Sequence, residues 1–355
     1  MERADEGMAF LLRYENVAWY EDGKVRILDR RIYPVRTEYV VCSSHEEVAQ
    51  AIADMVTQSG GPYTAAAMGM ALAAWEAGDM REEKLLEYME RAAYTLSHAR
   101  PTTVEKMKRV VEGALEETKK LVRDGITGKA LAEKLAEYAV RYIDQNYRRF
   151  ETIGSLLADR IPAGGTIMTQ CFAETIIGTL LKECRKRGNE IRLICPETRP
   201  YFQGARLTAS VACDMGFDVT VITDNMPACV MREKKVDLFT SAADVITMDG
   251  HIVNKIGTFQ IALAASYWGI PYYATGIPNQ AHPDMGSVKI EQRDPQLVLE
   301  AMGTKVTMPG VMGYYPAFDV TPPELVRGIV TDRGVFEPGE LKRYIEKGLE
   351  KNECS

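Results

Sequence analysis

The chain has 355 residues, of which 46% are hydrophobic and 26% charged, and its formal net charge at pH 7 is −7. The length favours two domains over one, and these proportions are ordinary for a soluble globular protein. Because no run of Lys and Arg exceeds three residues, the sequence argues against a nucleic-acid groove, and no apolar stretch approaches the roughly 20 residues of a membrane span.

The N-terminal residues are acidic, and their apolar part is too short for a signal peptide. Seven cysteines lie scattered along the chain without C-x-x-C spacing, so free thiols in a reducing cytoplasm are expected. The four histidines are dispersed as well, and no zinc site can be written from them.

The first part of the chain predicts a hairpin followed by helices. Two extended runs, residues 14–20 and 24–29, flank the turn-forming Glu21-Asp22-Gly23. A third extended run ends before Ser43-Ser44, which favours a helix start there. Amphipathic or alanine-rich patterns predict helices over residues 46–58, 63–77, 82–97 and 104–122, and a long helix from 129 to about 147 leads out of this part.

From residue 164 onwards, short β-branched runs alternate with helical patterns. Strands are expected over residues 166–169, 191–195, 218–223, 236–240 and 271–275. Such an α/β series predicts a mostly parallel sheet with helices on both faces. No G-x-G-x-x-G follows the first strand and no P-loop motif occurs, so a bound dinucleotide or P-loop nucleotide is not expected. Near the end, Thr321 with Glu324 three residues later predicts a capped helix start.

The segment SAADVITMDGHIVNKIGTF, residues 241–259, places charged groups at the carboxyl end of a strand. Asp244 follows an apolar run, and Asn254-Lys255 precedes a helical pattern. Ligands bind at that end of the strands in open α/β sheets, and a cation beside a helix N-terminus suits a phosphate. Burial among apolar neighbours would make Asp244 a general acid; a turn or cap acid is the alternative.

Three other strand ends also carry polar groups. Cys171 lies between a strand and a helix, where the helix dipole would lower the pKa of a thiol; a buried structural cysteine is the alternative. Residues 197–204, ETRPYFQG, could orient a polyol or could form a capping and ion-pair cluster. Asp224 is expected to cap a helix. A thiol, an acid and Lys255 with Arg100 as anion clamps suit proton transfer on a phosphorylated metabolite.

Three long motifs, ETRPYFQGARLTA, SAADVITMDGHIVNKIGT and YYPAFDVTPPELV, with MGMALAA and RPT earlier, resemble the methylthioribose-1-phosphate isomerase family. That family shares its fold with the regulatory subunits of the eukaryotic translation-initiation exchange factor, and the resemblance runs through most of the chain. It implies a small N-terminal β-hairpin and helical domain (1–125), a linker helix region (126–163) and a Rossmann-like, mostly parallel α/β domain (164–355). A homodimer is implied too.

The family converts an aldose 1-phosphate into a ketose 1-phosphate, and the resemblance implies no metal or organic cofactor. Because C1 is phosphorylated, the ring cannot open as a simple hemiacetal, so the enzyme needs its own acid and base. Asp244 matches the acid that would assist ring opening, and Cys171 matches the cysteine that would move a proton between C2 and C1. The positions implied to hold the phosphate and sugar hydroxyls are Arg100, Gln203, Asn254, Lys255 and Gly61.

Two stretches depart from the family's pattern. Ser59-Gly60-Gly61-Pro62 stands where the family has Arg-Gly-Ala-Pro, and Cys171 lacks the usual preceding histidine and following asparagine. The expected substrate is therefore a 5-substituted or 5-deoxy ribose 1-phosphate, either 5-methylthioribose 1-phosphate or 5-deoxyribose 1-phosphate. A ribose-1,5-bisphosphate isomerase and a non-catalytic regulatory or ligand-sensing protein on the same fold are the alternatives.

Overall fold

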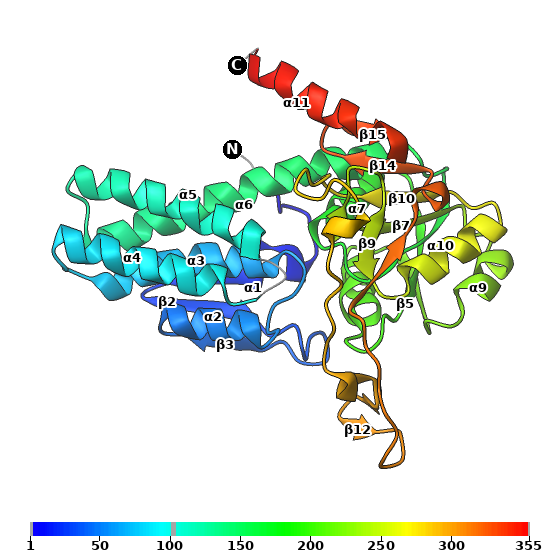
Figure 1. Ribbon diagram of the computed structural model, residues 1–355, viewed down its shortest axis with the longest axis horizontal. Helices are drawn as coiled ribbons and strands as arrows, with labels where there is room; N and C mark the ends of the chain where they lie inside the picture. The colour runs from blue at the N-terminus through cyan, green and yellow to red at the C-terminus, as the bar shows by residue number, and fades with distance from the viewer. Residues whose placement is uncertain (1–2, 101–103, 354–355) are drawn as a thin grey trace. The chain divides into compact units, whose positions relative to one another are not determined.

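The computed structural model describes residues 3–100 and 104–353, and the chain forms two compact units, Met1–Arg148 and Arg149–Ser355 (Figure 1). The division falls within α6 (Gly128–Ala158), a single helix of 31 residues. The domain limits expected from the sequence, 1–125, 126–163 and 164–355, stay a prediction. Among the described residues, no helix combines the length and apolarity that crossing a membrane requires.

The first unit begins with a three-stranded antiparallel sheet of β1 (Ala18–Glu21), β2 (Lys24–Leu28) and β3 (Tyr39–Cys42). Asp22 and Gly23 both have positive φ, 46° and 73°, as a tight two-residue hairpin turn requires. The expected strand over residues 14–20 is partly wrong, because residues 14–17 form the helical turn α1 (Tyr14–Val17). The hairpin itself is confirmed.

Four helices follow the sheet: α2 (His45–Ala53), α3 (Gly61–Ala77), α4 (Glu82–Ser97) and α5 (Val104–Arg123). Ser44 caps α2, since its hydroxyl accepts a hydrogen bond from the Glu47 N–H at 3.2 Å. The alanine-rich α3 is buried along nearly its whole length, so its small side chains serve close packing. Residues 101–103, which include Pro101 and Thr102 of the RPT motif, lie outside the described residues.

The second unit is built on a seven-stranded sheet in the order β15-β14-β10-β7-β4-β5-β6. Its strands are β4 (Thr166–Met168), β5 (Arg192–Pro196), β6 (Asp218–Ile222), β7 (Leu238–Ala242), β10 (Tyr272–Thr275), β14 (Gly328–Thr331) and β15 (Gly334–Phe336). All neighbours are parallel except β14 and β15. The mostly parallel sheet expected from the sequence is confirmed.

The order in which the chain adds strands to the sheet reverses at β4. The chain proceeds from β4 to β5 and β6 on one side, and then returns to β7 on the other side of β4. Such a reversal opens a crevice at the carboxyl ends of the two central strands, which is where ligands bind in open α/β sheets. Cys171 follows β4 and Asp244 follows β7, so both lie at this switch point.

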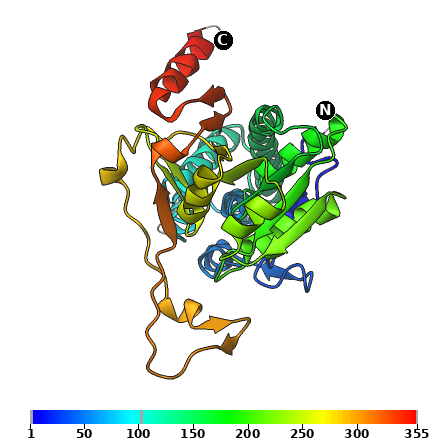
Figure 2. The same cartoon turned by 90° about the vertical axis from the view of Figure 1, so that its right-hand side faces the viewer.

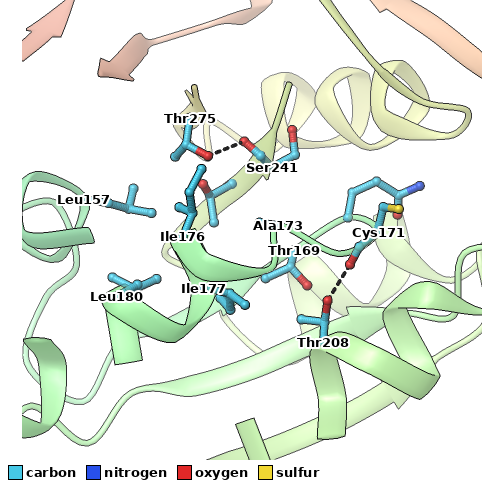
Figure 3. A pocket seen from close by; sticks show the side chains of 12 residues that line it. Leu157, Thr169, Cys171, Ala173, Ile176, Ile177, Leu180, Thr208, Ser241 and Thr275 are labelled. Carbon is cyan, nitrogen blue, oxygen red and sulfur yellow. Dashed lines mark hydrogen bonds between the residues drawn. The ribbon is translucent and has the colours of Figure 1, made fainter. Parts of the chain in front are cut away.

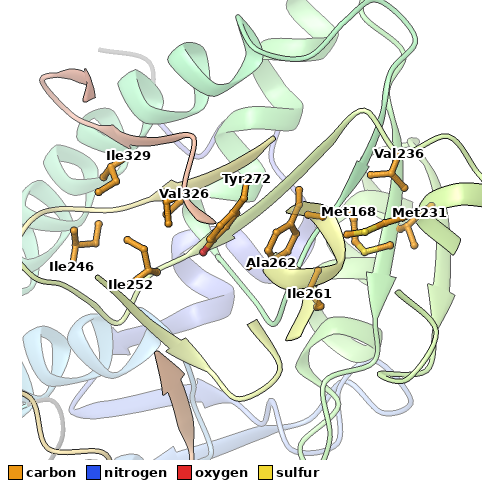
Figure 4. Close-up of a cluster of buried hydrophobic side chains, with 14 of the residues drawn as sticks. Met168, Met231, Val236, Ile246, Ile252, Ile261, Ala262, Tyr272, Val326 and Ile329 are labelled. Carbon is orange, nitrogen blue, oxygen red and sulfur yellow. The ribbon is translucent and has the colours of Figure 1, made fainter. Parts of the chain in front are cut away.

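Helices α7 (Thr175–Lys186), α8 (Ala209–Asp214), α9 (Pro227–Glu233), α10 (Thr258–Tyr267) and α11 (Lys342–Glu353) complete the second unit. Apolar side chains from α9, α10 and the central strands form a buried cluster (Figure 4). In it, the Phe239 and Tyr272 rings stack with centroids 4.4 Å apart. Burying a side chain of this size contributes roughly 2–3 kcal/mol, so the cluster makes β7 and β10 a rigid base for the loops above them.

A smaller antiparallel sheet, β13-β9-β8, adjoins the carboxyl end of β7. It comprises β8 (Val245–Ile246), β9 (Ile252–Lys255) and β13 (Phe318–Thr321). Between residues 293 and 315 the chain leaves the body of the second unit as an extended arm that carries the short strands β11 (Glu300–Ala301) and β12 (Thr304–Lys305) (Figures 1 and 2). Thr321 ends β13 and caps no helix, so the helix start expected there is wrong.

Candidate active site

The loop after β4 holds Cys171 in a strained conformation. Cys171 has φ +60°, which a non-glycine residue adopts only when its surroundings fix it. Its N–H donates to Thr198 Oγ1 at 3.2 Å, and its carbonyl accepts from Thr208 Oγ1 at 2.5 Å. Both partners belong to the segment after β5, so β5 determines where the thiol lies.

The Cys171 thiol is half-buried, and its surroundings favour the protonated form. Burial raises the pKa of Cys171 to about 11, while the Lys255 ammonium and the Arg293 guanidinium act to lower it. The expectation of a pKa lowered by a helix dipole is wrong. The physical reason is that α7 begins only at Thr175, so desolvation outweighs the effect of the helix terminus.

This environment predicts how Cys171 reacts with iodoacetamide in the ligand-free protein. With a pKa near 11, only the rare thiolate reacts, so the alkylation rate should rise about tenfold per pH unit between pH 7 and 10. Peptide mass spectrometry after short exposures measures this rate, with the exposed Cys213 as internal reference for an accessible thiol. A rate that levels off below pH 9 would contradict the assignment.

A hydrogen bond ties the β4 loop to the β9–α10 connection. Gln170 Nε2 donates to the Ile256 carbonyl at 3.0 Å. Gly257 adjoins this contact with φ +100°, and a Cβ there would lie 3.1 Å from Gln170 Nε2. Glycine therefore allows both the backbone conformation and the close approach. The tie holds Lys255, at the end of β9, beside the loop that carries Cys171.

Lys255 is buried at the end of β9, where it faces aromatic and charged groups. Its Nζ lies 4.6 Å from the centroid of the Phe318 ring on the paired strand β13. Burial lowers the pKa of this ammonium, and Arg293 acts in the same direction, while Cys171 and Asp244 act to raise it. A buried cation of this kind is a strong binder of an anion that displaces water.

Asp244 lies between β7 and β8 and is held by its backbone. Its N–H donates to the Val253 carbonyl at 2.9 Å, which places it alongside β9. The side chain is exposed, so the expected burial of this acid is wrong. The physical reason is that Asp244 lies in the connection between β7 and β8, where the flanking Ala243 and Val245 are themselves only half-buried. Burial dominates the pKa shifts of Cys171 and Lys255, and the Asp244 carboxylate acts to raise both.

Asn254 is buried beside Lys255 and turns toward the start of α10. Its Nδ2 donates to Thr258 Oγ1 at 3.0 Å, and Thr258 Oγ1 in turn donates to the Lys255 carbonyl at 2.7 Å. Asp319 on β13 accepts from the N–H groups of Gly257 at 2.7 Å and Phe259 at 3.2 Å. Helix α10 therefore begins with an acid already at its N-terminus, and burial raises the pKa of Asp319 to about 6.

The segment after β5 is fastened by Asp224. Its carboxylate accepts from the Thr198 N–H and the Arg199 N–H, both at 2.7 Å. Asp224 therefore caps no helix, and the cap prediction is wrong. Gln203 follows and is buried, and its Oε1 meets no hydrogen-bond partner among the described residues. An acceptor left open in this way is available to a ligand hydroxyl.

The π-helical turn Gly204–Thr208 comes next and depends on its first residue. A Cβ at Gly204 would lie 1.8 Å from the Pro196 carbonyl oxygen. Gly204→Ala should therefore lower the free energy of unfolding by about 3 kcal/mol. Urea denaturation measures the loss, and Gly339→Ala is the control because a Cβ there meets nothing within 4 Å. Equal stability of the two variants would contradict this close approach.

Two groups at the site were not predicted from the sequence, although one of them, Tyr315, lies within the motif YYPAFDVTPPELV. Arg293 and Tyr315 belong to the two ends of the extended arm. Their Nη1 and hydroxyl groups are buried and meet no hydrogen-bond partner among the described residues. Arg293 lies over the rings of Tyr201 and Phe318, at 5.8 and 5.7 Å from the centroids. For Arg293 the available signal is a lone arginine in a polar loop, which is too common to single out. For Tyr315 it is the motif YYPAFDVTPPELV, which marks the segment but not the role of this side chain.

Arg100 and Gly61, the remaining predicted binding residues, belong to the first unit. Gly61 is the first residue of α3 and is buried, with a Cβ there 1.8 Å from Thr57 Oγ1. Arg100 is half-buried at the end of the segment that follows α4. The second unit alone brings Cys171, Asp244, Asn254, Lys255 and Gln203 to one edge of its sheet, and the roles of Gly61 and Arg100 stay predictions.

A small pocket lies behind Cys171 (Figure 3). Its lining includes Leu157, Ile176, Ile177 and Leu180, with Thr169 and Thr208 nearer the thiol. The enclosed space is about 10 Å³, room for one water molecule at most. A sugar phosphate cannot enter it, so a substrate has to approach Cys171 from the side of Lys255 and Arg293.

Among the described residues, one group of side chains comes close enough to share a metal ion: His45, Glu46 and Glu76 in the first unit. His45 Nδ1 already lies 2.9 Å from Glu76 Oε2, and its ring packs edge-on against Tyr88. These contacts give the group a structural role without an ion. It is separate in sequence from every residue of the candidate site.

Sheet order and site together define a class of protein: a Rossmann-like α/β protein whose ligand site lies at the switch point of a parallel sheet. The chain belongs to the Initiation factor 2 subunit family, whose sequence model matches residues 59–338. A methylthioribose-1-phosphate isomerase from Thermotoga neapolitana is 34% identical over 92% of this chain and 96% of its own. A methylthioribose-1-phosphate isomerase from Heliobacterium modesticaldum is 36% identical over 91% of this chain and 96% of its own.

Solved structures agree with these relatives. The crystal structure of 5-methylthioribose 1-phosphate isomerase from Pyrococcus horikoshii is 32% identical, with a TM-score of 0.80 over 94% of this chain and 96% of that one. A structure described as translation initiation factor eIF-2B, subunit delta, from A. fulgidus is 28% identical, with a TM-score of 0.81 over 94% and 99%. The fold class is confirmed, and the chain is an isomerase, of the intramolecular oxidoreductase class.

Proposed function

We propose that this chain converts a 5-substituted or 5-deoxy ribose 1-phosphate into the corresponding ribulose 1-phosphate. The observation that carries the proposal is the switch point near which Cys171, Asp244 and Lys255 lie: Asp244 acts to raise the pKa of Cys171 and that of Lys255, and Lys255 acts to lower the pKa of Cys171. A thiol, a carboxylate and a buried cation supply the acid, the base and the phosphate contact that this isomerisation needs. The substrate named for the relatives, methylthioribose 1-phosphate, supports this class.

The proposed reaction moves two protons and oxidises nothing overall. Asp244 gives a proton to the ring oxygen as the bond from C1 to that oxygen breaks. The Cys171 thiolate then takes the proton from C2, which leaves an enol with its double bond between C1 and C2. Cys171 returns that proton to C1 as the C2 hydroxyl gives its proton to Asp244, and C2 becomes a carbonyl. Both side chains end as they began.

Lys255 and Arg293 have a clear part in this scheme. The thiol holds its proton in the ligand-free protein, because burial raises the pKa of Cys171 to about 11. A thiolate therefore forms only with stabilisation from the two cations that act to lower this pKa. Asn254 and Gln203 would bind sugar hydroxyls, and Arg100 and Gly61 would contribute from the first unit.

The test is a panel of sugar 1-phosphates that differ only at C5. Purified protein is incubated with 5-methylthioribose 1-phosphate, 5-deoxyribose 1-phosphate and ribose 1,5-bisphosphate, and ketose formation is followed by NMR. We expect kcat/KM for at least one of the first two sugars to exceed that for the bisphosphate by more than 10-fold. A 10-fold ratio corresponds to a difference of about 1.4 kcal/mol in activation free energy. Saturable binding of all three without product would instead favour a regulatory or ligand-sensing protein.

We also propose that the protein is a cytoplasmic homodimer. The cytoplasmic location accords with seven cysteines that a reducing compartment would keep as thiols. The dimer accords with the exposed apolar side chains on α10 and after it, Leu263, Tyr267 and Trp268. Sedimentation equilibrium gives the mass directly, and a value of 39.6 kDa, that of one chain, would refute the dimer.

A further inference from the structure

The base of the extended arm brings two residues that are far apart in the sequence into one place. The Arg293 N–H donates to the Tyr315 carbonyl at 3.0 Å, and the Ala317 N–H donates to the Glu291 carbonyl at 2.9 Å. The next residue, Phe318, pairs with Lys255 across β13 and β9. The two ends of the arm therefore deliver the Arg293 and Tyr315 side chains to the neighbourhood of Lys255 and Cys171.

Arg293 is oriented on one edge and open on the other. Its Nε lies 2.9 Å and its Nη2 3.4 Å from the two carboxylate oxygens of Glu291. Its Nη1 is buried and has no hydrogen-bond partner among the described residues, although only 10% of the side chain is exposed. A buried guanidinium nitrogen without a partner destabilises a protein, so its retention points to a ligand.

Tyr315 repeats this pattern beside it. Its hydroxyl is buried and meets no partner within the described part of the chain, and its ring lies 6.5 Å from that of Tyr201. Burial raises the pKa of Tyr315 to about 12, while the neighbouring Arg293 guanidinium acts to lower it, so the hydroxyl keeps its proton and can donate a hydrogen bond. Two donors, one charged and one neutral, thus remain open at the base of the arm.

Two cations share one aromatic ring at this place. Lys255 Nζ lies 4.6 Å and the Arg293 guanidinium 5.7 Å from the centroid of Phe318. The ionisable groups that act on the pKa of Lys255 here are Arg293, Glu291, Asp244 and Cys171, and Glu291 is already paired with Arg293. Two buried like charges repel strongly unless an anion lies between or beside them. A doubly charged oxyanion would offset the repulsion between the two cations and would accept hydrogen bonds from the two open donors.

We infer that Arg293 and Tyr315 bind the phosphate group of the substrate together with Lys255. Arginine donates to phosphate in a fixed fork geometry, and Glu291 fixes that fork with Nη1 facing the ligand. The Tyr315 hydroxyl donates to a second phosphate oxygen. This inference rests on the proposed function for the sugar, but the anion site itself follows from the open donors alone.

The kinetic test compares Arg293→Gln, Arg293→Lys and Tyr315→Phe with the parent. Arg293→Gln should raise KM roughly 100-fold, Arg293→Lys about 10-fold because the fork is lost, and Tyr315→Phe about 5-fold. Matched controls are Arg333→Gln and Tyr344→Phe, whose side chains pack together with the guanidinium 4.4 Å from the ring centroid. These residues follow β14 and begin α11, and their substitution should leave KM unchanged.

A measurement independent of turnover uses inorganic phosphate. Phosphate bound at this site should slow alkylation of the half-buried Cys171 but not of the exposed Cys213 and Cys229. The phosphate concentration that halves the alkylation rate should be at least 10-fold higher in Arg293→Gln than in the parent. If the arginine merely held the arm, its substitution would lower Tm and leave this concentration unchanged.

The outcomes separate the two claims. Sugar-phosphate turnover with KM and phosphate protection unchanged in Arg293→Gln would overturn the inference and leave the proposed function intact. Phosphate protection that Arg293→Gln abolishes, in a protein that isomerises no sugar phosphate of the panel, would overturn the proposed function and support the anion site. Absence of phosphate protection in the parent protein would overturn the anion site.

Discussion

Cys171→Ser should lower kcat at least about 1000-fold, with KM changed less than about 5-fold. A serine hydroxyl keeps the size of the thiol and its backbone contacts to Thr198 and Thr208, but it is a far weaker acid and cannot take and return the C2 proton. Well-placed proton transfer contributes roughly 100- to 10,000-fold to a rate. Ketose formation followed by NMR under saturating substrate measures kcat.

Cys213→Ser is the matched control, because Cys213 is an exposed cysteine on α8 of the same unit. It should keep the parent kcat. If Cys171→Ser retained turnover within a few-fold of that control, the thiol would carry no proton in the reaction, and the proposed scheme would be wrong.

Asp244→Asn should lower kcat roughly 300-fold, because an amide cannot protonate the ring oxygen as the ring opens. The loss should be smaller than for Cys171→Ser, since the exposed position of Asp244 lets water or buffer acids supply part of the proton transfer. Small carboxylic acids such as formate should therefore restore part of the rate in Asp244→Asn and none in Cys171→Ser. Initial rates at rising formate concentration test this difference.

Asp218→Asn provides the control for charge alone, since Asp218 is an exposed acid at the start of the edge strand β6. It should behave as the parent. Full activity in Asp244→Asn would remove the acid from the proposed scheme, whatever the result for Cys171.

Five strands of the seven-stranded sheet, β4 to β7 and β10, and their parallel pairing followed from the sequence because that information is local, whereas the strand order and the added strands β14 and β15 were not predicted. Short β-branched runs such as residues 191–195 and 218–223 alternate with helical patterns, and each predicted strand is present with limits shifted by a few residues. Polar residues directly after these runs had to gather at one edge, since parallel strands end on the same side. Cys171 and Asp244 could be singled out on that basis. Lys255 was singled out as a cation ahead of a helical pattern, and it lies at the end of β9 in the small antiparallel sheet.

The electrostatic properties of the site could not be predicted from local sequence patterns. A helix N-terminus stabilises a thiolate, and burial destabilises it. Which effect is larger depends on how many residues separate the cysteine from the first helical turn. For Cys171, residues 172–174 intervene, so burial has the larger effect. Likewise, Thr321 and Glu324 have the spacing of a capped helix, but pairing of Thr321 with Ile252 makes it a strand residue. Burial decided the outcome at Cys171, and strand pairing overrode local propensity at Thr321.

Arg293 and Tyr315 could not be predicted from spacing because their proximity is created by a bridge between segments more than twenty residues apart, Gln292 with Pro316. No periodic pattern marks such a bridge. A hydrogen-bonding group without a partner can be recognised only when every neighbouring atom is placed. The groups that a ligand would bind are therefore the part of the site that is hardest to predict from the sequence.

The arm is held at its base by the bridge and again at β11, where Arg199 Nη2 donates to the Glu300 carbonyl at 2.7 Å. Beyond β12 lies the tip of the arm, with side chains such as Met308 and Met312 that are 78% and 92% exposed, and the reacting groups are fixed before the chain reaches it. Length and composition of that tip can thus change through evolution, or through insertion of a tag or a reporter peptide, without moving a catalytic atom. The arm is a natural site for engineering this enzyme.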